Sequence, residues 1–279
     1  MRVCLWLSLM CVGCAGPGED ASNSDAPSTE VYVIRTITIG RVEDGVSEGF
    51  DLDHVSTARG DPTGCGQTDW VDPSGQTGID NAMGSIMPLL DGTEAAVAGT
   101  LLQGAVDSGE LLLLLEVSHD ADGPAFRMLR GNSEALLGTN GLLLPYQTFD
   151  LDPDVSGGDP VAASSDADGN MVATDFAFQL PLEILRAKLS FSFNSTAMRM
   201  GPDEGGVRSG VVGGGAPWEP IVAELNTTPI DDSVKAILST VVAQKADLDP
   251  DEQGVCRSMS AVFTFDAVPA FVYPDAAGG

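Results

Sequence analysis

The chain has 279 residues, with 41 Asp and Glu against 13 Lys and Arg, so its formal net charge is −28 at pH 7. An electrostatic field of that sign repels phosphate backbones and anionic headgroups, which excludes nucleic acid as an expected partner. Hydrophobic residues make up 43% of the chain, enough for one sizeable core.

The first residues have the pattern of an export signal. Arg2 precedes an apolar run, Val3–Val12, which is too short to span a bilayer because a spanning helix needs about 20 apolar residues. The segment Cys11-Val12-Gly13-Cys14 resembles the bacterial lipobox, in which a small residue precedes the cysteine that is lipidated. This pattern predicts a signal peptide over residues 1–13 and lipid attachment at Cys14. The alternative is an ordinary secreted protein with an incidental cysteine.

The residues that follow predict a tether. Residues 14–29 contain no large apolar side chain, so they cannot bury enough surface to fold, and we expect lipidated Cys14 followed by a disordered segment. In Gram-negative lipoproteins an Asp directly after the lipidated cysteine retains the protein in the inner membrane, so Ala15 implies, by resemblance, the outer membrane. The rest of the chain, residues 30–279, is expected to form a single β-rich globular domain.

Several segments of this domain have strand patterns. Val31–Ile39 alternates between two faces and is rich in β-branched side chains. Leu111–Val117 is a short apolar run, typical of a strand buried on both faces, and Phe126–Arg130 fits as its hairpin partner. The other predicted strands cover residues 142–152, 171–178, 189–194, 207–212 and 258–267. Glycines between 205 and 215 lack the spacing of a phosphate loop and predict either close backbone packing or a hinge before a helix at Trp218.

Three or four helices are expected beside these strands. Asp80 can cap a helix with an apolar face that includes Ile86 and Leu90, and Thr93 begins a second periodic segment. Ile230–Lys245 has the clearest apolar stripe. Because strands outnumber helices and neighbouring strands are mostly joined by turns, the sequence predicts an α+β fold. Its expected form is an antiparallel β-sheet or sandwich with three or four packed helices.

Two cysteines remain after export and lipidation. Cys65 and Cys256 lie far apart in the sequence, and in an oxidising compartment such a pair predicts one structural disulfide. A reactive thiol is the alternative, but neither cysteine has the neighbouring His or Lys that lowers a thiol pKa.

Two near copies of the sequence D-L-D-P-D predict a weak calcium site. Alternating carboxylates in a turn can converge their oxygens on one hard cation, and solvated turns are the alternative. Val155 and Glu252 occupy the position that an EF-hand reserves for Gly, so the expected affinity is of the extracellular kind, about 10⁻⁴ to 10⁻³ M. The candidate ligands are Asp150, Asp152, Asp154, Asp247, Asp249 and Asp251.

The sequence gives no credible catalytic set. Gly45–Gly49 matches the G-x-S-x-G pattern around Ser47, but the residues after it do not begin a helix, as a nucleophile elbow requires. The only histidines, His54 and His119, lack the spacing of a zinc site, and each has a neighbouring carboxylate, as loop histidines often do. An exported serine hydrolase using Ser47 is therefore the least favoured function.

Several motifs carry a family resemblance. The Gly64-Cys65-Gly66 segment, Gly78-Ile79-Asp80-Asn81, and the stretch from Asp247 to Cys256 resemble a group of uncharacterised acidic lipoproteins of Gram-negative bacteria. The resemblance covers most of residues 49–272 and implies an envelope location and a paired cysteine, but no activity. We expect a lipid-anchored outer-membrane protein without a catalytic centre or resident cofactor, in a binding or structural role. A calcium-dependent module that binds glycan or protein is the alternative.

Overall fold

In the computed structural model, the described residues are 28–91, 98–120, 123–152, 158–184, 187–227 and 231–273. The predicted signal peptide, Cys14 and the predicted tether up to residue 27 lie outside them. Strand β1 (Ser28–Ile39) begins two residues before the predicted boundary at Glu30. Within these ranges no helix combines the length and apolar character needed to cross a membrane.

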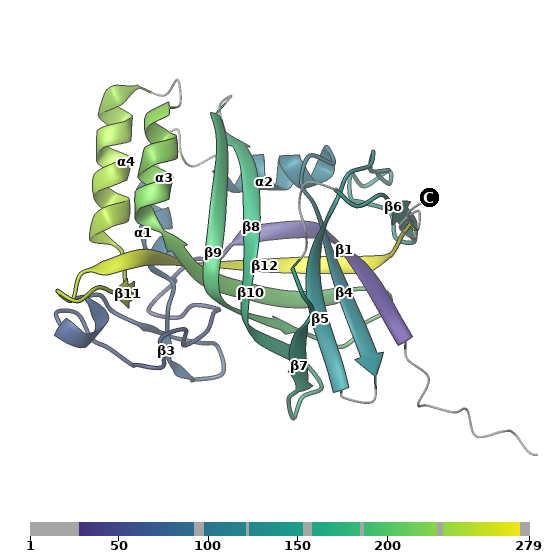
Figure 1. Cartoon of the computed structure of the whole chain (residues 1–279), viewed down its shortest axis with the longest axis horizontal. Helices are drawn as coiled ribbons and strands as arrows, with labels where there is room; N and C mark the ends of the chain where they lie inside the picture. The colour runs from purple at the N-terminus through teal and green to yellow at the C-terminus, as the bar shows by residue number, and fades with distance from the viewer. Residues whose placement is uncertain are drawn as a thin grey trace, which may run out of the picture.

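Eight antiparallel strands pair in a closed ring (Figure 1). In order around the ring they are β1, β4 (Leu112–Asp120), β5 (Gly123–Gly131), β7 (Val161–Ser165), β8 (Met171–Ile184), β9 (Ala187–Met200), β10 (Arg208–Pro217) and β12 (Cys256–Val272). Strand β1 closes the ring because it pairs on both sides: Val31 lies opposite Glu116 of β4 and opposite Ala270 of β12. Two short strands, β6 (Gln147–Phe149) and β11 (Leu248–Pro250), also pair with β12.

The predicted α+β sheet or sandwich is therefore wrong: the protein is a mostly β structure built on a closed barrel. Alternation of side chains shows that a strand has one buried face, and a sandwich and a barrel both satisfy that pattern. Closure depends on the pairing of the first strand with the last, which no local pattern encodes. The strand predicted over residues 142–152 is also too long, since the strand formed there, β6, has three residues.

Aromatic side chains from four strands form a continuous row in the core. Phe126 of β5 contacts Phe176 of β8 edge to face, with ring centroids 5.2 Å apart. Phe178 stacks on Phe193 of β9 at 4.6 Å, and Phe193 meets Phe263 of β12 at 5.6 Å. Burying such rings supplies much of the hydrophobic free energy of a core. The predicted burial of 111–117 is confirmed for its leucines, which belong to the same cluster.

Four helices in the described ranges cover parts of the barrel. They are α1 (Ala82–Leu90), α2 (Ala98–Asp107), α3 (Trp218–Thr227) and α4 (Asp232–Gln244). Helix α2 contacts both β1 and β8, which lie on opposite sides of the ring, and its Leu102 and Val106 are buried in the core. Helices α3 and α4 pack on each other and contact β12. In Figure 1 this pair stands at one end of the molecule, away from the C-terminal end of β12.

A long connection, residues 40–81, links β1 to α1 and is called the acidic loop below. It contains the 3₁₀ turn η1 (Pro62–Gly64) and a small hairpin of β2 (Trp70–Val71) and β3 (Thr77–Ile79). The Cys65–Cys256 disulfide joins it to the first residue of β12. Gln67 also donates a 2.9 Å hydrogen bond from Nε2 to the carbonyl of Gln244. The loop is thereby held against the same end of β12 that α4 covers.

The acidic loop ends at the cap of α1. Asn81, rather than the predicted Asp80, caps this helix: its Oδ1 accepts a 2.9 Å hydrogen bond from the backbone N–H of Gly84. The predicted close packing at the glycines of β10 is confirmed, since a Cβ at Gly214 would lie 2.3 Å from Cγ2 of Thr196. Only a residue without a side chain fits there.

Candidate functional site

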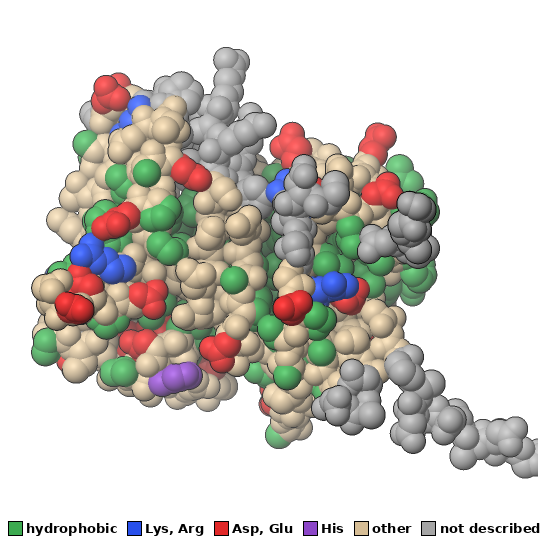
Figure 2. Space-filling model, in the orientation of Figure 1, with side chains coloured by type: hydrophobic (Ala, Val, Ile, Leu, Met, Phe, Trp, Pro, Cys, Tyr) green, Lys and Arg blue, Asp and Glu red, His purple; other side chains and the backbone are tan. Residues whose placement is uncertain are grey.

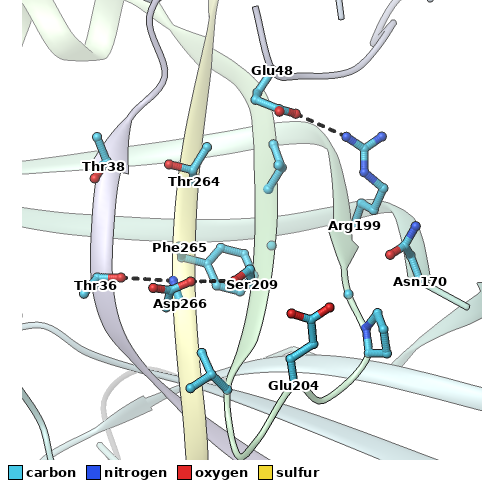
Figure 3. A pocket seen from close by; sticks show the side chains of 15 residues that line it. Thr36, Thr38, Glu48, Asn170, Arg199, Glu204, Ser209, Thr264, Phe265 and Asp266 are labelled. Atoms are coloured by element: carbon cyan, nitrogen blue, oxygen red, sulfur yellow. Dashed lines mark hydrogen bonds and ion pairs between the residues drawn. The ribbon is translucent and has the colours of Figure 1, made fainter. Parts of the chain in front are cut away.

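A groove crosses four neighbouring strands, β1, β12, β10 and β9 (Figure 3). Its volume is about 670 Å³, and we call it the barrel groove. The acidic loop and the β9–β10 connection also contribute residues to its lining. Its polar lining side chains are Thr36, Thr38, Glu48, Asn170, Arg199, Glu204, Ser209, Thr264 and Asp266.

Strand register explains why polar side chains collect in the groove. Asp266 lies opposite Thr36 of β1 on one side and opposite Ser209 of β10 on the other, so the three form one row across the sheet. The next residues along these strands, including Ile37 and Phe265, belong to the buried core. Because alternate residues of a strand face opposite sides, the row of Asp266 faces outward from the barrel.

The carboxylates of the groove outnumber its single cation. Arg199 is already engaged, with Nη2 3.3 Å from Oε2 of Glu48 and its guanidinium 5.8 Å from the ring centre of Phe50. Asp266 accepts a 2.6 Å hydrogen bond from the Ser209 hydroxyl. The carboxylate of Glu204 extends into the groove without a partner among the described residues (Figure 3). The groove therefore has a negative electrostatic character.

A second group of carboxylates lies in the acidic loop. Asp51, Asp53 and Asp80 each present a ligand atom within 4.8 Å of the others, and we call these three residues the acidic cluster. Asp80 is 1% exposed, and its Oδ2 accepts a 2.7 Å hydrogen bond from the N–H of Leu52. Carboxylate oxygens at such spacing are the ligand type that calcium prefers.

Burial and like charges raise the pKa values of acids in this region. Burial is the main cause that raises the pKa of Asp80 to about 9, and the nearby charge of Asp247 raises it further. Burial also raises the pKa of Asp247 to about 7, although hydrogen bonds from the Ser260 hydroxyl and N–H oppose that rise. The pKa values of Asp53 and Asp69 are raised by burial as well. Asp80 and Asp247 therefore hold protons at a pH at which isolated Asp is charged.

One oxygen of the cluster is buried without a hydrogen bond. Oδ1 of Asp51 has no partner in the described structure. The same carboxylate lies against Gly78, where a Cβ would come within 3.2 Å of Asp51 Oδ2. A buried carboxylate oxygen without a donor is costly, and a bound cation would remove that cost. A cavity of about 450 Å³, lined by Trp70, Lys245 and Asp247, opens beside this region.

The described carboxylates of the two D-L-D-P-D copies do not form a cluster in the structure. In the first copy Asp152 lies 3.6 Å from Arg130 and Asp150 bonds with Ser133, while Asp154 lies outside the described residues. In the second copy Asp247 is buried beside the acidic cluster. Asp249 is exposed, and Asp251 pairs with Arg257. One predicted ligand, Asp247, is thus close enough to act electrostatically on Asp80.

Ser47 does not have the environment of a nucleophile. It is 2% exposed, its hydroxyl donates a 2.8 Å hydrogen bond to the carbonyl of Glu48, and it accepts one from Nδ2 of Asn81. His54 and His119 are both exposed, and neither bonds to Ser47. The G-x-S-x-G segment therefore serves the capping network of α1 in this structure.

Comparison of the chain with family models, with curated proteins and with solved structures gave no match. The candidate sites therefore rest on the geometry of this chain.

The sequence interpretation missed the residues of both sites. Asp51 and Asp53 share the D-L-D spacing of the two copies, and that spacing was the signal available in the acidic loop. For the groove, the only local signal was the polar face of each strand. Which polar faces adjoin depends on the ring order, because Thr36 and Asp266 are 230 residues apart.

Proposed function

We propose that this protein is an exported, lipid-anchored envelope protein with a non-catalytic binding role, and that the barrel groove binds a positively charged polar ligand. The lipobox pattern supports the anchor, and the disulfide between Cys65 and Cys256 fits an oxidising compartment. The observation that carries the binding role is the groove itself, where Glu204 and Asp266 face a cavity whose one arginine is already paired. A ligand with amines or guanidinium groups would neutralise both carboxylates.

The anchor is tested by metabolic labelling with radioactive palmitate in a Gram-negative host. Label should enter the wild-type chain and be absent from Cys14→Ala. Equal labelling of the two chains would refute the anchor. Mass spectrometry of the purified protein gives a second measure, since the N-terminal peptide should begin at Cys14 and carry acyl mass.

The groove is tested by calorimetric titration with a hexalysine peptide, with hexaglutamate as the oppositely charged probe. We expect hexalysine alone to bind, with an affinity that falls as salt rises. Glu204→Gln and Asp266→Asn should each weaken binding by about two- to fivefold, the range for exposed ion pairs. The control Glu110→Gln removes an exposed carboxylate outside the groove and should leave the affinity unchanged. Equal losses in all three variants would show only a diffuse charge effect.

Calcium-dependent binding is a second candidate function, favoured by the buried, unpartnered Oδ1 of Asp51 within the acidic cluster. Asp51, Asp53 and Asp80 would supply carboxylate oxygens, and the nearby charge of Asp247 would add attraction for a divalent cation. The cluster lies in the acidic loop, which also contributes Glu48 to the barrel groove. An ion there would therefore order a segment that forms part of the groove wall.

Thermal unfolding with and without calcium tests this candidate. With a dissociation constant of about 10⁻⁴ to 10⁻³ M, 10 mM calcium would stabilise the fold by about 1.4–2.7 kcal/mol. That corresponds to a rise in Tm of roughly 3–10 °C for a domain of this size. The rise should disappear in Asp51→Asn and persist in Asp150→Asn. The reverse pattern would assign calcium to the first D-L-D-P-D copy. No rise in the Tm of the wild type would dismiss calcium binding.

A further inference from the structure

An exposed apolar surface lies at the C-terminal end of β12. Of the ten large hydrophobic side chains that are exposed in the described structure, six belong to two neighbouring segments, 136–146 and 271–273. Their exposed fractions run from 42% to 62%. We call this surface the apolar patch, and its members are Leu136, Leu137, Leu144, Tyr146, Phe271 and Tyr273. Apolar surface concentrated in this way marks an interaction site more often than scattered single residues do.

Backbone contacts hold the two segments together. Tyr146 donates a 2.6 Å hydrogen bond from its N–H to the carbonyl of Pro269, and its ring lies 6.4 Å from that of Phe271. Leu144 bonds through its N–H to the carbonyl of Leu136 at 3.0 Å. Tyr273 bonds in the same way to the carbonyl of Phe149 at 3.0 Å. Figure 2 shows hydrophobic side chains gathered at the side of the molecule where β12 ends in Figure 1.

The chain leading from Cys14 reaches the barrel beside this patch. Val31 of β1 pairs with Ala270 of β12, so Phe271 lies next to the first residues of β1. Thirteen residues separate Cys14 from Ser28. The sequence predicts a tether here, and a chain of that length without fixed structure would have a root-mean-square span of about 20 Å. A lipid anchor at Cys14 would therefore hold this side of the barrel close to the bilayer at a high effective concentration.

We propose that the apolar patch rests on the surface of the bilayer to which Cys14 is anchored, an inference that depends on the proposed lipid anchor. Tyrosine suits the boundary because its ring enters the acyl region while its hydroxyl stays among the headgroups. A second copy of the chain is a poorer occupant, since two bodies of charge −28 repel each other. For the same reason, contact is stronger on zwitterionic than on anionic lipid.

The test uses a tryptophan reporter in the full, lipidated protein. Phe271→Trp is reconstituted in vesicles of phosphatidylcholine, with either ordinary or brominated acyl chains, and the wild-type emission is subtracted. Bromine should quench the added emission about twofold. The control Ile237→Trp places the reporter at an exposed apolar position of α4, outside the patch, and should show no quenching. Vesicles that contain phosphatidylglycerol should reduce the quenching of Phe271→Trp.

The outcomes separate this inference from the anchor on which it rests. Acylated protein whose Phe271→Trp emission is unquenched would overturn the bilayer contact and leave the anchor intact. Protein without acyl mass at Cys14 would overturn both. A chain that sediments as a dimer, and becomes a monomer with Phe271→Ser, would assign the patch to self-association and also overturn the proposal.

Discussion

Cys65 and Cys256 are 191 residues apart in the sequence, yet their Cα atoms lie 5.9 Å apart and their sulfurs are bonded. The bond joins the acidic loop to the first residue of β12, the strand that closes the barrel against β1. It therefore couples the acidic cluster to the frame of the fold. The loop that also contributes Glu48 to the barrel groove is held from one side by this bond.

Replacing both cysteines, with Cys65→Ser and Cys256→Ser, should lower the free energy of unfolding by about 2–5 kcal/mol, because the cross-link restricts the unfolded chain. Denaturant titration measures the loss. Treatment of wild type with dithiothreitol should give a similar decrease, and the double variant should not respond to the reductant. Free thiols at both positions in protein purified from the envelope would contradict the prediction.

Stability in calcium-free buffer should fall as pH rises from about 4 to about 9. Asp80 has a pKa of about 9 in the folded chain against an ordinary value of 3.8, and that of Asp247 is about 7. Between the unfolded and folded pKa values the folded chain holds a proton that the unfolded chain has released, so stability decreases with pH. The contribution of Asp247 is lost by about pH 7, and that of Asp80 by about pH 9.

The contribution of Asp80 to this pH dependence is the difference between the stability curves of wild type and Asp80→Asn, because the other carboxylates titrate in both proteins. The variant should lose less stability than wild type between pH 7 and pH 9, measured as Tm at each pH. Parallel curves for the two chains would mean that Asp80 is charged in the fold at neutral pH. With 10 mM calcium the wild-type loss should shrink, since the cation favours the charged carboxylates.

Gly210→Ala should destabilise the barrel by about 1–3 kcal/mol through overpacking. A Cβ at Gly210 would lie 2.4 Å from the Phe265 ring and 2.8 Å from the carbonyl of Arg199. The matched control is Gly104→Ala in α2, where a Cβ meets nothing within 4 Å. That change should stabilise the protein by about 0.5–1 kcal/mol, since alanine favours a helix over glycine. Equal effects of the two changes, measured by urea unfolding, would contradict the prediction.

Asn81→Ala should cost about 2 kcal/mol of stability, because it removes a helix cap and a buried hydrogen bond to the hydroxyl of Ser47. Asn81 accepts from the N–H of Gly84 and donates to the hydroxyl of Ser47 at 2.8 Å. The control Asn226→Ala changes an exposed asparagine in α3 and should alter stability by less than about 0.5 kcal/mol. A loss in Asn81→Ala no larger than in the control would show that the network contributes little.

Much of the secondary structure could be predicted from local patterns. The alternation in Val31–Ile39 gave β1, the apolar run from Leu111 gave β4, and the stripe in Ile230–Lys245 gave α4. These elements can be predicted because each buries one face or stripe, and this burial produces a periodic pattern of apolar residues within a short stretch of sequence. The predicted cap at Asp80 was one residue early, since Asp80 and Asn81 are both good caps and only the structure shows which side chain meets Gly84.

The sequence by itself determined seven of the eight barrel strands, with β7 missed, most helices, the acidic charge and the pair of cysteines left for a disulfide, because those depend on composition and short-range spacing. Only the tertiary structure decided that the strands close into a barrel and that Asp51, Asp53 and Asp80 meet. It also decided that Thr36, Ser209 and Asp266 line one groove. The physical reason is that each of these groupings depends on contacts between distant segments, whose register is fixed by burial of the whole core.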